Sequence, residues 1–292
     1  WYHGYFTAYR HMAEDHPDVV FFLGDYIYEY AINAKNLFRD VTLSAAHNAK
    51  TVTLSQYRLR YSLFKTDPDL QAIHALAPWV VTMDDHEVEN NYAGIHSQYN
   101  TSPDDFLRQR AAAYQAFYEN IPIRSTSIPN GPDMLMYRRF RYGNLAEFNV
   151  LDTRQYRNNF PANEAERLEP SRSILGFDQE RWLFNGLSRS DTVWNFLVQQ
   201  VVLAQIDRDT GPGVEYSTDQ WDGFPACRDR LFSAYKAYGI QNPVVLTGDI
   251  HRHAAADLKE NFDDAGSATI GTELITTCLL YTSPSPRDRQ KS

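Results

Sequence analysis

Residues 79–91 constrain the fold most strongly, because a buried-strand pattern ends there in a burst of polar residues. Residues 79–83, WVVTM, are apolar and β-branched, which suits a buried strand. DDHEVENN follows at once, so carboxylates, an imidazole and amides stand where the strand ends. Open α/β folds usually place their sites at this carboxyl edge of the sheet. The stretch predicts either a metal site or a solvated acidic loop, and convergent segments elsewhere must decide between them.

The same pattern occurs near the N-terminus. Residues 18–23, DVVFFL, form a predicted strand that leads into GDYIYE at residues 24–29. Gly24 permits a tight turn. Asp25 could bridge two cations with its two carboxylate oxygens, and Tyr28 could reach the same site as a phenolate if a ferric ion lowers its pKa. GDxxY after a buried strand is more specific than a lone GD dipeptide, which would indicate only a turn.

A third predicted strand, residues 145–151, forms a hairpin with residues 137–142 and leads into Asp152 and Arg154. The guanidinium of Arg154 offers a fork of donors that suits phosphate oxygens. A salt bridge between Arg154 and Asp152 is an equally good interpretation, and the two are compatible.

A fourth predicted strand, residues 243–247, leads into Gly248, Asp249 and His251. Asp249 and His251 stand two residues apart, so we expect them to project to one side of an extended segment. Four strands with such ends favour a metal site over solvated loops. Carboxylate, imidazole and amide donors select Ca²⁺, Fe or Mn, and two close metal ions would suit phosphoryl transfer by an activated water.

The remaining patterns complete a predicted α/β fold. Apolar spacing predicts helices over residues 3–14 and 106–118 and a helix over 178–187 capped by Asp178. We expect partly helical structure over 31–61, a turn and short helix from 65, a loop over 158–173, a strand over 192–203, a helix ending near 238 and a last strand over 268–276. Gln199 and Gln200 are expected to satisfy strand ends, and His74 to be packed or solvated.

Composition excludes several classes of protein. The 292 residues are 43% hydrophobic, enough to bury the core of one large domain or two small ones. The net charge of -9 gives no sign of the clustered Lys and Arg that nucleic-acid binding requires. No run approaches the length of a membrane helix, and no signal peptide is present.

Both ends of the chain look incomplete. Residues 278–292, CLLYTSPSPRDRQKS, resemble a translated sequencing adapter and are excluded from fold reasoning. The chain opens at Trp1 without an initiator methionine. We therefore expect one domain over residues 1–277, truncated at both ends. Cys278 belongs to the excluded segment, which leaves Cys227 without a disulfide partner.

Seven segments together resemble the PhoD-type alkaline phosphatases and phosphodiesterases, within the calcineurin-like metallophosphoesterase superfamily. They are HGYFTAYRHMA, LGDYIYEY, KTDPDL, DDHEVENN, LDTRQYR, WDGFPACRDR and LTGDIHRH, and the likeness covers nearly all of residues 1–277. The resemblance implies a four-layer αββα sandwich, in which two β-sheets pack face to face with helices outside. It also implies a site with one Fe³⁺ and two Ca²⁺.

Carried to this chain, the resemblance implies a specific set of metal ligands: Asp25 as the bridging carboxylate, Tyr28 as the phenolate on iron, and Asp84, Asp85, Asn91, Asp249 and His251. It leaves open how Asp84 and Asp85 divide their role. The resemblance further implies that His86 stabilises the transition-state oxyanion or protonates the leaving group. It also implies that Arg154 holds phosphate.

The function expected from the resemblance is metal-dependent hydrolysis of phosphate monoesters or diesters by a metal-activated water at alkaline pH. The substrates would be small phosphate esters, and the parent protein is expected to be exported, with its signal absent from this chain.

The family also has a cysteine iron ligand shortly before the segment that matches Trp1. A folded but inactive fragment that only binds ligands is therefore the alternative. Hydrolysis of carboxylic esters or amides is disfavoured, because no His-rich zinc motif such as HExxH is present. Oligomeric state is left open.

Overall fold

The computed structural model of the chain describes residues 4–32 and 39–276. In chain order, its first half contains α1 (Thr7–Glu14), β1 (Val20–Phe22), η2 (Ala45–Asn48), α2 (Leu54–Phe64), α3 (Pro68–Leu76), β2 (Trp79–Val81), α4 (Pro103–Asn120) and η3 (Ser125–Ser127). Its second half contains β3 (Arg138–Tyr142), β4 (Ala146–Val150), α5 (Glu164–Arg167), α6 (Phe177–Leu187), β5 (Trp194–Val198), η4 (Trp221–Gly223), α7 (Pro225–Tyr238), β6 (Pro243–Thr247), β7 (Ala254–Lys259) and β8 (Thr269–Ile275).

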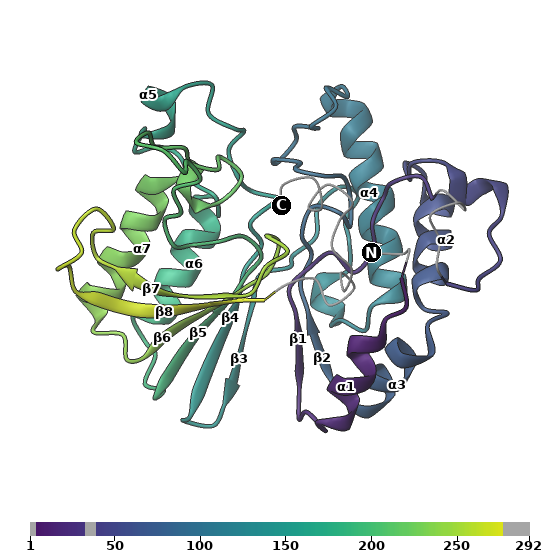
Figure 1. Ribbon diagram of the computed structural model, residues 1–292, viewed down its shortest axis with the longest axis horizontal. Helices are drawn as coiled ribbons and strands as arrows, with labels where there is room; N and C mark the ends of the chain where they lie inside the picture. Colours follow the sequence, from purple (N-terminus) through teal and green to yellow (C-terminus); the bar gives the residue numbers. More distant parts are fainter. Residues whose placement is uncertain (1–3, 33–38, 277–292) are drawn as a thin grey trace.

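The strands form two sheets with helices outside, as expected for an αββα sandwich. β1 and β2 pair in parallel, and the other six strands form a sheet in the order β3-β4-β5-β6-β8-β7. Helices α1 to α4 lie on the side of the two-stranded sheet, whereas α6 and α7 cover the larger sheet (Figure 1). Phe21 of β1 stacks on Phe148 of β4 with 4.7 Å between ring centroids, so the sheets meet through aromatic side chains.

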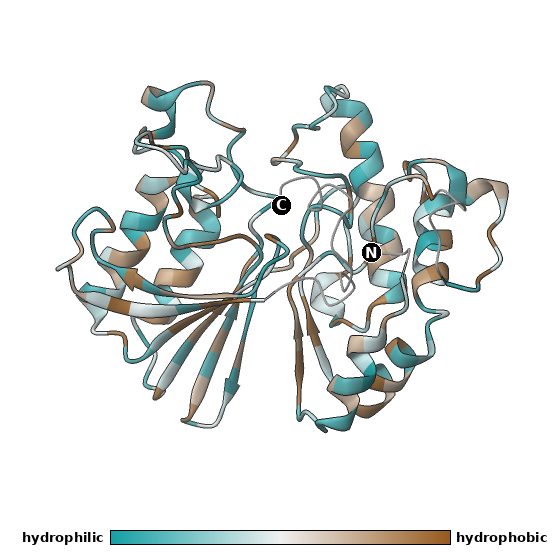
Figure 2. Ribbon diagram, in the orientation of Figure 1, coloured by the Kyte–Doolittle hydropathy of each residue, from teal (hydrophilic) through white to brown (hydrophobic). Residues whose placement is uncertain are grey.

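Each half of the chain has its own apolar core. One cluster gathers residues between Phe6 and Met136, and the other gathers residues between Leu151 and Ile275. Strands β1 and β2 are mainly hydrophobic, whereas β3, with the sequence RRFRY, is mostly hydrophilic (Figure 2). Val81, Val198 and Val245 are fully buried, as expected for strands that are covered on both faces.

Parallel pairing brings the polar strand ends together. Phe22 is paired with Val81, so the segments that begin at Leu23 and Thr82 leave their sheet side by side. In the larger sheet, Val150 is paired with Val198 and Val198 with Leu246. All of these strands therefore release their loops at one edge, where the candidate site residues begin.

Gln200 ties these strand ends to one another. Its side chain accepts hydrogen bonds from Thr153 N and Oγ1, at 3.0 and 2.6 Å. It donates to Thr82 Oγ1 and Leu151 O, at 2.8 and 2.9 Å. The sequence-based expectation that Gln200 satisfies strand ends is confirmed, and this amide joins the β2 end to the β4 end across the two sheets. His74 is packed, as expected: its ring stacks on Trp79 with 3.8 Å between centroids.

Several element predictions were wrong in detail. Asp178 is not the cap of α6: the N-cap is Gly176, at a φ of 70° that favours glycine, and Asp178 lies in the first turn. The loop over 158–173 contains α5, whose N-cap Asn163 accepts a hydrogen bond from Glu166 N. The strand over 192–203 ends at Val198, and the side chains of Gln199 and Gln200 after it are fully buried. β7 escaped prediction because its exposed alanines carry no apolar alternation.

Two further expectations concern the C-terminal segment and membrane-spanning helices. The proposed adapter segment at 278–292 lies outside the described residues. Among residues 4–32 and 39–276, no helix combines the length and the apolar character that crossing a bilayer requires.

Gly24→Ala is expected to destabilise the fold by about 3 kcal/mol. Gly24 has a φ of 112°, and a Cβ there would lie 2.4 Å from Asp84 Cβ, where the loops after β1 and β2 cross. Urea unfolding of the two proteins measures the difference in unfolding free energy. Gly131→Ala is the matched control, since Gly131 also has a positive φ of 60° but nothing lies within 4 Å of an added Cβ. Its cost should be about 1 kcal/mol. Equal costs at the two positions would contradict the close approach of the loops.

Candidate metal centre

The loop after β1 presents Asp25 in an unusual backbone conformation. Asp25 has a φ of 59°, in the left-handed region that aspartate tolerates better than most residues. Its side chain is buried, and its Oδ2 accepts a hydrogen bond from the Tyr28 hydroxyl at 3.2 Å. Its Oδ1 is a buried oxygen without a hydrogen-bond partner in the part of the chain that the structure describes. A buried carboxylate oxygen without a donor needs another electrophile, and a cation would satisfy it.

The loop after β2 is held against the first loop by Glu87. The Glu87 carboxylate is fully buried and accepts from Asp25 N at 3.0 Å, from Asp84 N at 2.8 Å and from Tyr26 N. Glu87 is therefore not a free ligand, although it stands inside the acidic motif. It uses three backbone donors to fix the distance between the two loops.

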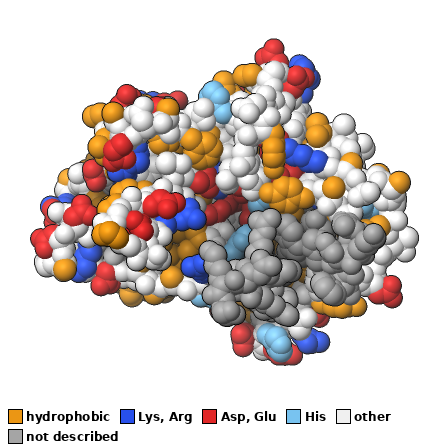
Figure 3. Space-filling model, turned by 45° about the horizontal axis from the view of Figure 1, so that its top comes forward, with side chains coloured by type: hydrophobic (Ala, Val, Ile, Leu, Met, Phe, Trp, Pro, Cys, Tyr) orange, Lys and Arg blue, Asp and Glu red, His pale blue; other side chains and the backbone are white. Residues whose placement is uncertain are grey.

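Five of the candidate residues converge on one place. One ligand atom each from Asp25, Asp85 and His86 lie within 4.8 Å of one another, and the same holds for Asp84, Asp85 and Asp249. Asp85 belongs to both groups. Acidic side chains are visible near the middle of the face in Figure 3, beside the part of the surface that is not described. A spacing of this kind could hold more than one metal ion, with Asp85 placed between them.

Asp85 is itself tightly oriented. Its Oδ1 accepts from His86 N at 3.0 Å, and its Oδ2 accepts from Asn91 N at 2.6 Å. Asn91 has a φ of 49° and lines the cavities described below, so it reaches the site although its side chain belongs to neither ligand group.

Asp249 and His251 reach the site by a different geometry from the one that the sequence suggests. The expected extended segment is wrong, because Asp249 and His251 have φ values of 66° and 56°. A left-handed turn follows β6 instead. Asp249 Oδ2 accepts from Gln220 Nε2 at 2.7 Å, and His251 Nε2 lies 3.4 Å from the Tyr28 hydroxyl. His251 thus joins the group around Tyr28 and Asp25, while Asp249 joins the group around Asp84.

His86 is held by a second buried carboxylate. His86 Nδ1 lies 2.7 Å from Glu29 Oε2, and Glu29 Oε1 also accepts from Asn90 N at 3.0 Å. Burial alone would lower the pKa of His86, but Asp85 and Glu29 outweigh it and raise the pKa to about 9. The two carboxylates therefore favour the imidazolium form of His86, and the Nδ1 contact orients its ring.

Arg154 is a buried cation among the carboxylates. Its Nε donates to Asp84 Oδ1 at 2.5 Å, its Nη1 to Asp219 Oδ1 at 2.6 Å, and its Nη2 lies 3.1 Å from Asp219 Oδ2 and 3.5 Å from Asp249 Oδ1. The predicted salt bridge with Asp152 is wrong. Asp152 Oδ1 instead accepts the backbone N–H groups of Arg154 and Gln155, as a carboxylate does at the start of a turn.

The acidic groups of the site differ in their readiness to ionise. Burial, together with repulsion among the neighbouring carboxylates, raises the pKa of Asp25 well above its usual range. Burial likewise raises the pKa of Asp84, and raises the pKa of Asp249 to about 6. For Asp85, burial is outweighed by Arg154, His86 and backbone donors, which hold its pKa at about 2. Burial and mutual repulsion make it unfavourable to ionise several of these carboxylates together. A site for hard cations fits this arrangement, because bound cations would stabilise the negative charge.

Sequence reasoning missed four residues that position the centre: Glu29, Glu87, Asp219 and Gln220. Glu29 and Glu87 lie in the segments LGDYIYEY and DDHEVENN. The sequence does not indicate that Glu29 contacts the His86 imidazole and Glu87 contacts backbone N–H groups, rather than a cation. Asp219 and Gln220 lie before the WDGF segment and carry no strand-end signal. Their contacts with Arg154, Arg157 and Asp249 come from a long loop that only the fold brings to the site.

Two cavities open beside the centre. One has a volume of about 780 Å³ and the other about 560 Å³, and both are lined by Asn91, Arg208, Ser217 and Asp219. The first is walled mainly by amide and hydroxyl side chains of the segments around Gln98 and Thr218. The second includes Asp249 itself. A small molecule bound in either cavity would therefore lie next to the carboxylate cluster.

The sequence and fold of this chain are similar to those of known proteins. A family model described as PhoD-like phosphatase matches residues 1–292. Alkaline phosphatase D of Bacillus subtilis (strain 168) is 47% identical over 283 residues, which are 95% of this chain and 48% of that protein. A solved structure described as "Structure of PhoD" matches with a TM-score of 0.88 and 45% identity, over 96% of this chain and 55% of that chain. The chain thus spans about half the length of these relatives.

The metal-stripped protein is expected to lose stability as pH rises from about 5 to 8. The pKa of Asp249, raised to about 6, and that of Glu87, raised by burial to about 7, mean that the folded chain binds these protons more tightly than the unfolded chain. Such a contribution is present at low pH and lost as pH rises through the folded pKa. Thermal unfolding with a chelator should show a falling Tm.

Two comparisons sharpen this measurement. Adding Ca²⁺ should remove most of the fall, because a bound cation favours the ionised carboxylates. Asp249→Asn should reduce the fall in the metal-stripped protein, since the amide does not titrate. A metal-stripped Tm that rises over this pH range would contradict the charge assignment.

Proposed function

The chain belongs to the PhoD-like phosphatase family, and on that premise we propose that it hydrolyses phosphate monoesters or diesters with a metal-activated water at alkaline pH. The observation that carries the proposal is the convergence of Asp25, Asp84, Asp85, His86 and Asp249 from three strand ends. Asp25 Oδ1, a buried carboxylate oxygen without a hydrogen-bond partner among the described residues, also fits a site that holds a cation.

We propose one Fe³⁺ and two Ca²⁺ as the metal ions. Tyr28 lies within 3.4 Å of both Asp25 and His251, and a phenol, an imidazole and a carboxylate together suit Fe³⁺. Asp84, Asp85 and Asp249 lie together and would supply carboxylate oxygens, which suit Ca²⁺. Asn91 would add an amide oxygen. When bound, the ions would lower the pKa of a water and neutralise charge on the phosphoryl group.

The chain's own residues would orient the phosphate. Arg154 is fixed by Asp84 at Nε and by Asp219 at Nη1, so its guanidinium plane is held in one orientation. Its Nη2 has the longest contacts, and this is the donor that a phosphate oxygen could take most readily. Arg157 shares Asp219 and keeps that carboxylate in place.

His86 would supply the proton for the leaving group. As water oxygen bonds to phosphorus and the ester P–O bond breaks, the departing oxygen needs a proton, and an imidazolium can give it. Asp85 and Glu29 raise the pKa of His86, which favours the imidazolium form that this role requires. Glu29 holds Nδ1, and Nε2 has no hydrogen-bond partner among the described residues, so Nε2 is the nitrogen that would face substrate.

Hydrolysis of 4-nitrophenyl phosphate and bis(4-nitrophenyl) phosphate by the purified chain tests the proposal directly. The assay should be run at alkaline pH with added Ca²⁺ and iron, alongside metal analysis of the protein. Turnover that a chelator abolishes and Ca²⁺ restores is the expected result. A folded chain that binds metal but turns over neither ester would favour the alternative, a domain that only binds ligands.

Asp25→Asn is expected to lower kcat by roughly a thousandfold or more, because an amide is a weaker ligand than a carboxylate for a hard cation. Asparagine tolerates the positive φ at this position, so the fold should survive. Asp18→Asn, an exposed aspartate just before β1, is the matched control and should keep wild-type turnover. Metal content and Tm of each variant separate loss of metal from loss of fold. Near-normal turnover by the folded Asp25→Asn variant would contradict the assignment of Asp25 as an essential metal ligand.

A further inference from the structure

The 560 Å³ cavity beside the metal centre contains two arginines, Arg208 and Arg252, in its wall. Both side chains are exposed to solvent. Within residues 4–32 and 39–276, neither guanidinium makes an ion pair or a side-chain hydrogen bond; the backbone N–H of Arg208 donates to Glu215 O. Two cations thus face a cavity without a protein partner to neutralise them.

The carboxylates of the same wall are already paired. Asp219 is held by Arg154 and Arg157, Asp222 Oδ1 by Arg228 Nη1 at 2.7 Å, and Asp249 by Arg154 and Gln220. None of these contacts involves Arg208 or Arg252. The guanidinium groups of those two arginines are therefore not engaged by the three carboxylates, and His253 also lines the cavity.

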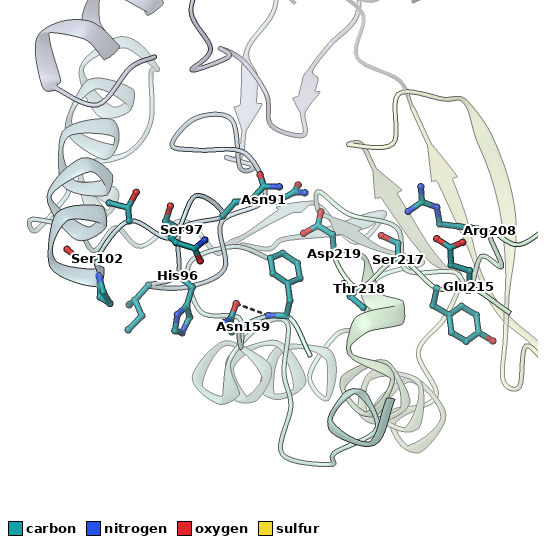
Figure 4. A pocket seen from close by; sticks show the side chains of 17 residues that line it. Asn91, His96, Ser97, Ser102, Asn159, Arg208, Glu215, Ser217, Thr218 and Asp219 are labelled. Atoms are coloured by element: carbon teal, nitrogen blue, oxygen red, sulfur yellow. Dashed lines mark hydrogen bonds between the residues drawn. The ribbon is translucent and has the colours of Figure 1, made fainter. Parts of the chain in front are cut away.

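The position of Arg208 relates this charge to the centre. In Figure 4, Asn91 and Asp219 lie near the middle of the larger cavity, and Arg208 lies at one end with Glu215, away from His96 and Ser102. Arg208, Asn91 and Asp219 line both cavities, so the two spaces adjoin at these residues, and Asp249 of the carboxylate cluster lines the smaller one. A molecule whose phosphate sits at the centre could extend into the smaller cavity toward both arginines.

We propose that Arg208 and Arg252 form a binding site for a second anionic group, a carboxylate or phosphate carried on the substrate outside the scissile phosphoester. The site rests on the proposed phosphatase function and adds a requirement to it: the preferred substrate bears at least two anionic groups. An arginine fork binds either group through charge-assisted hydrogen bonds. The selectivity arises because a substrate with a neutral tail leaves both cations without a partner.

The test measures binding rather than turnover, so that it does not depend on the reaction. Alkylphosphonates resist hydrolysis, and a series of ω-carboxyalkylphosphonates of increasing length is compared with plain alkylphosphonates of the same length. Calorimetric titration of the Ca²⁺-loaded chain gives the Kd of each. At the length that spans the cavity, the carboxylate should improve the Kd about tenfold or more.

Substitutions of the two arginines test whether they cause the tighter binding of the carboxylate-bearing ligand. The double variant Arg208→Ala/Arg252→Ala should lose the carboxylate advantage, and Arg208→Lys/Arg252→Lys should keep part of it, because charge remains without the planar fork. Arg189→Ala is the matched control: Arg189 is exposed after α6, at the opposite edge of the sheet, and its loss should leave the advantage intact.

Several outcomes would overturn the inference. They are equal Kd values at every chain length, no binding of any phosphonate, or an undiminished carboxylate advantage in Arg208→Ala/Arg252→Ala. Failure of the proposed function looks different, since a chain that hydrolyses no chromogenic ester could still show the carboxylate advantage. Turnover of chromogenic esters without that advantage removes the second anion site and leaves the phosphatase assignment standing.

Discussion

The candidate centre depends on one buried carboxylate, Glu87, which accepts backbone N–H groups from two separate loops. Asp25 and Tyr26 donate from the loop after β1, and Asp84 donates from the loop after β2. Three donors on one carboxylate form charge-assisted bonds where water does not compete. The loops can approach this closely only because Gly24 has no Cβ at their crossing. The spacing between Asp25 and Asp84 is therefore set by a residue that is not a candidate ligand.

Electrostatic balance explains how so many acids are buried together. Arg154 supplies a permanent positive charge in contact with Asp84, Asp219 and Asp249, and His86 supplies another beside Asp85. Even so, the pKa of Asp25 and that of Asp84 stay raised, because two cations do not offset the whole group. The uncompensated part of this charge is what metal ions would neutralise, and removing one carboxylate would change the pKa of the others.

The fold positions these groups by ending the parallel-paired strands β1, β2, β4, β5 and β6 at one edge, and polar side chains beneath the loops hold that edge together. Gln200 joins Thr82, Leu151 and Thr153, so the two sheets cannot slide without breaking buried hydrogen bonds. The long loop before η4 then adds Asp219 and Gln220 from above. A rigid sheet edge below and longer loops above give a centre of fixed geometry beside cavities whose lining comes from the loops.

The sequence by itself determined the strand ends and their chemistry: WVVTM before DDHEVENN, DVVFFL before GDYIYE, and VVLT before GDIH already place carboxylates and imidazoles after buried strands. These are local patterns, and β6 begins and ends where its apolar run predicts. Only the tertiary structure decided which polar groups face one another. Arg154 pairs with Asp84 and Asp219 rather than Asp152, and Glu29 pairs with His86. The reason is physical: such contacts join residues 57 to 70 positions apart, and sequence spacing carries no information about loops that meet only through sheet pairing.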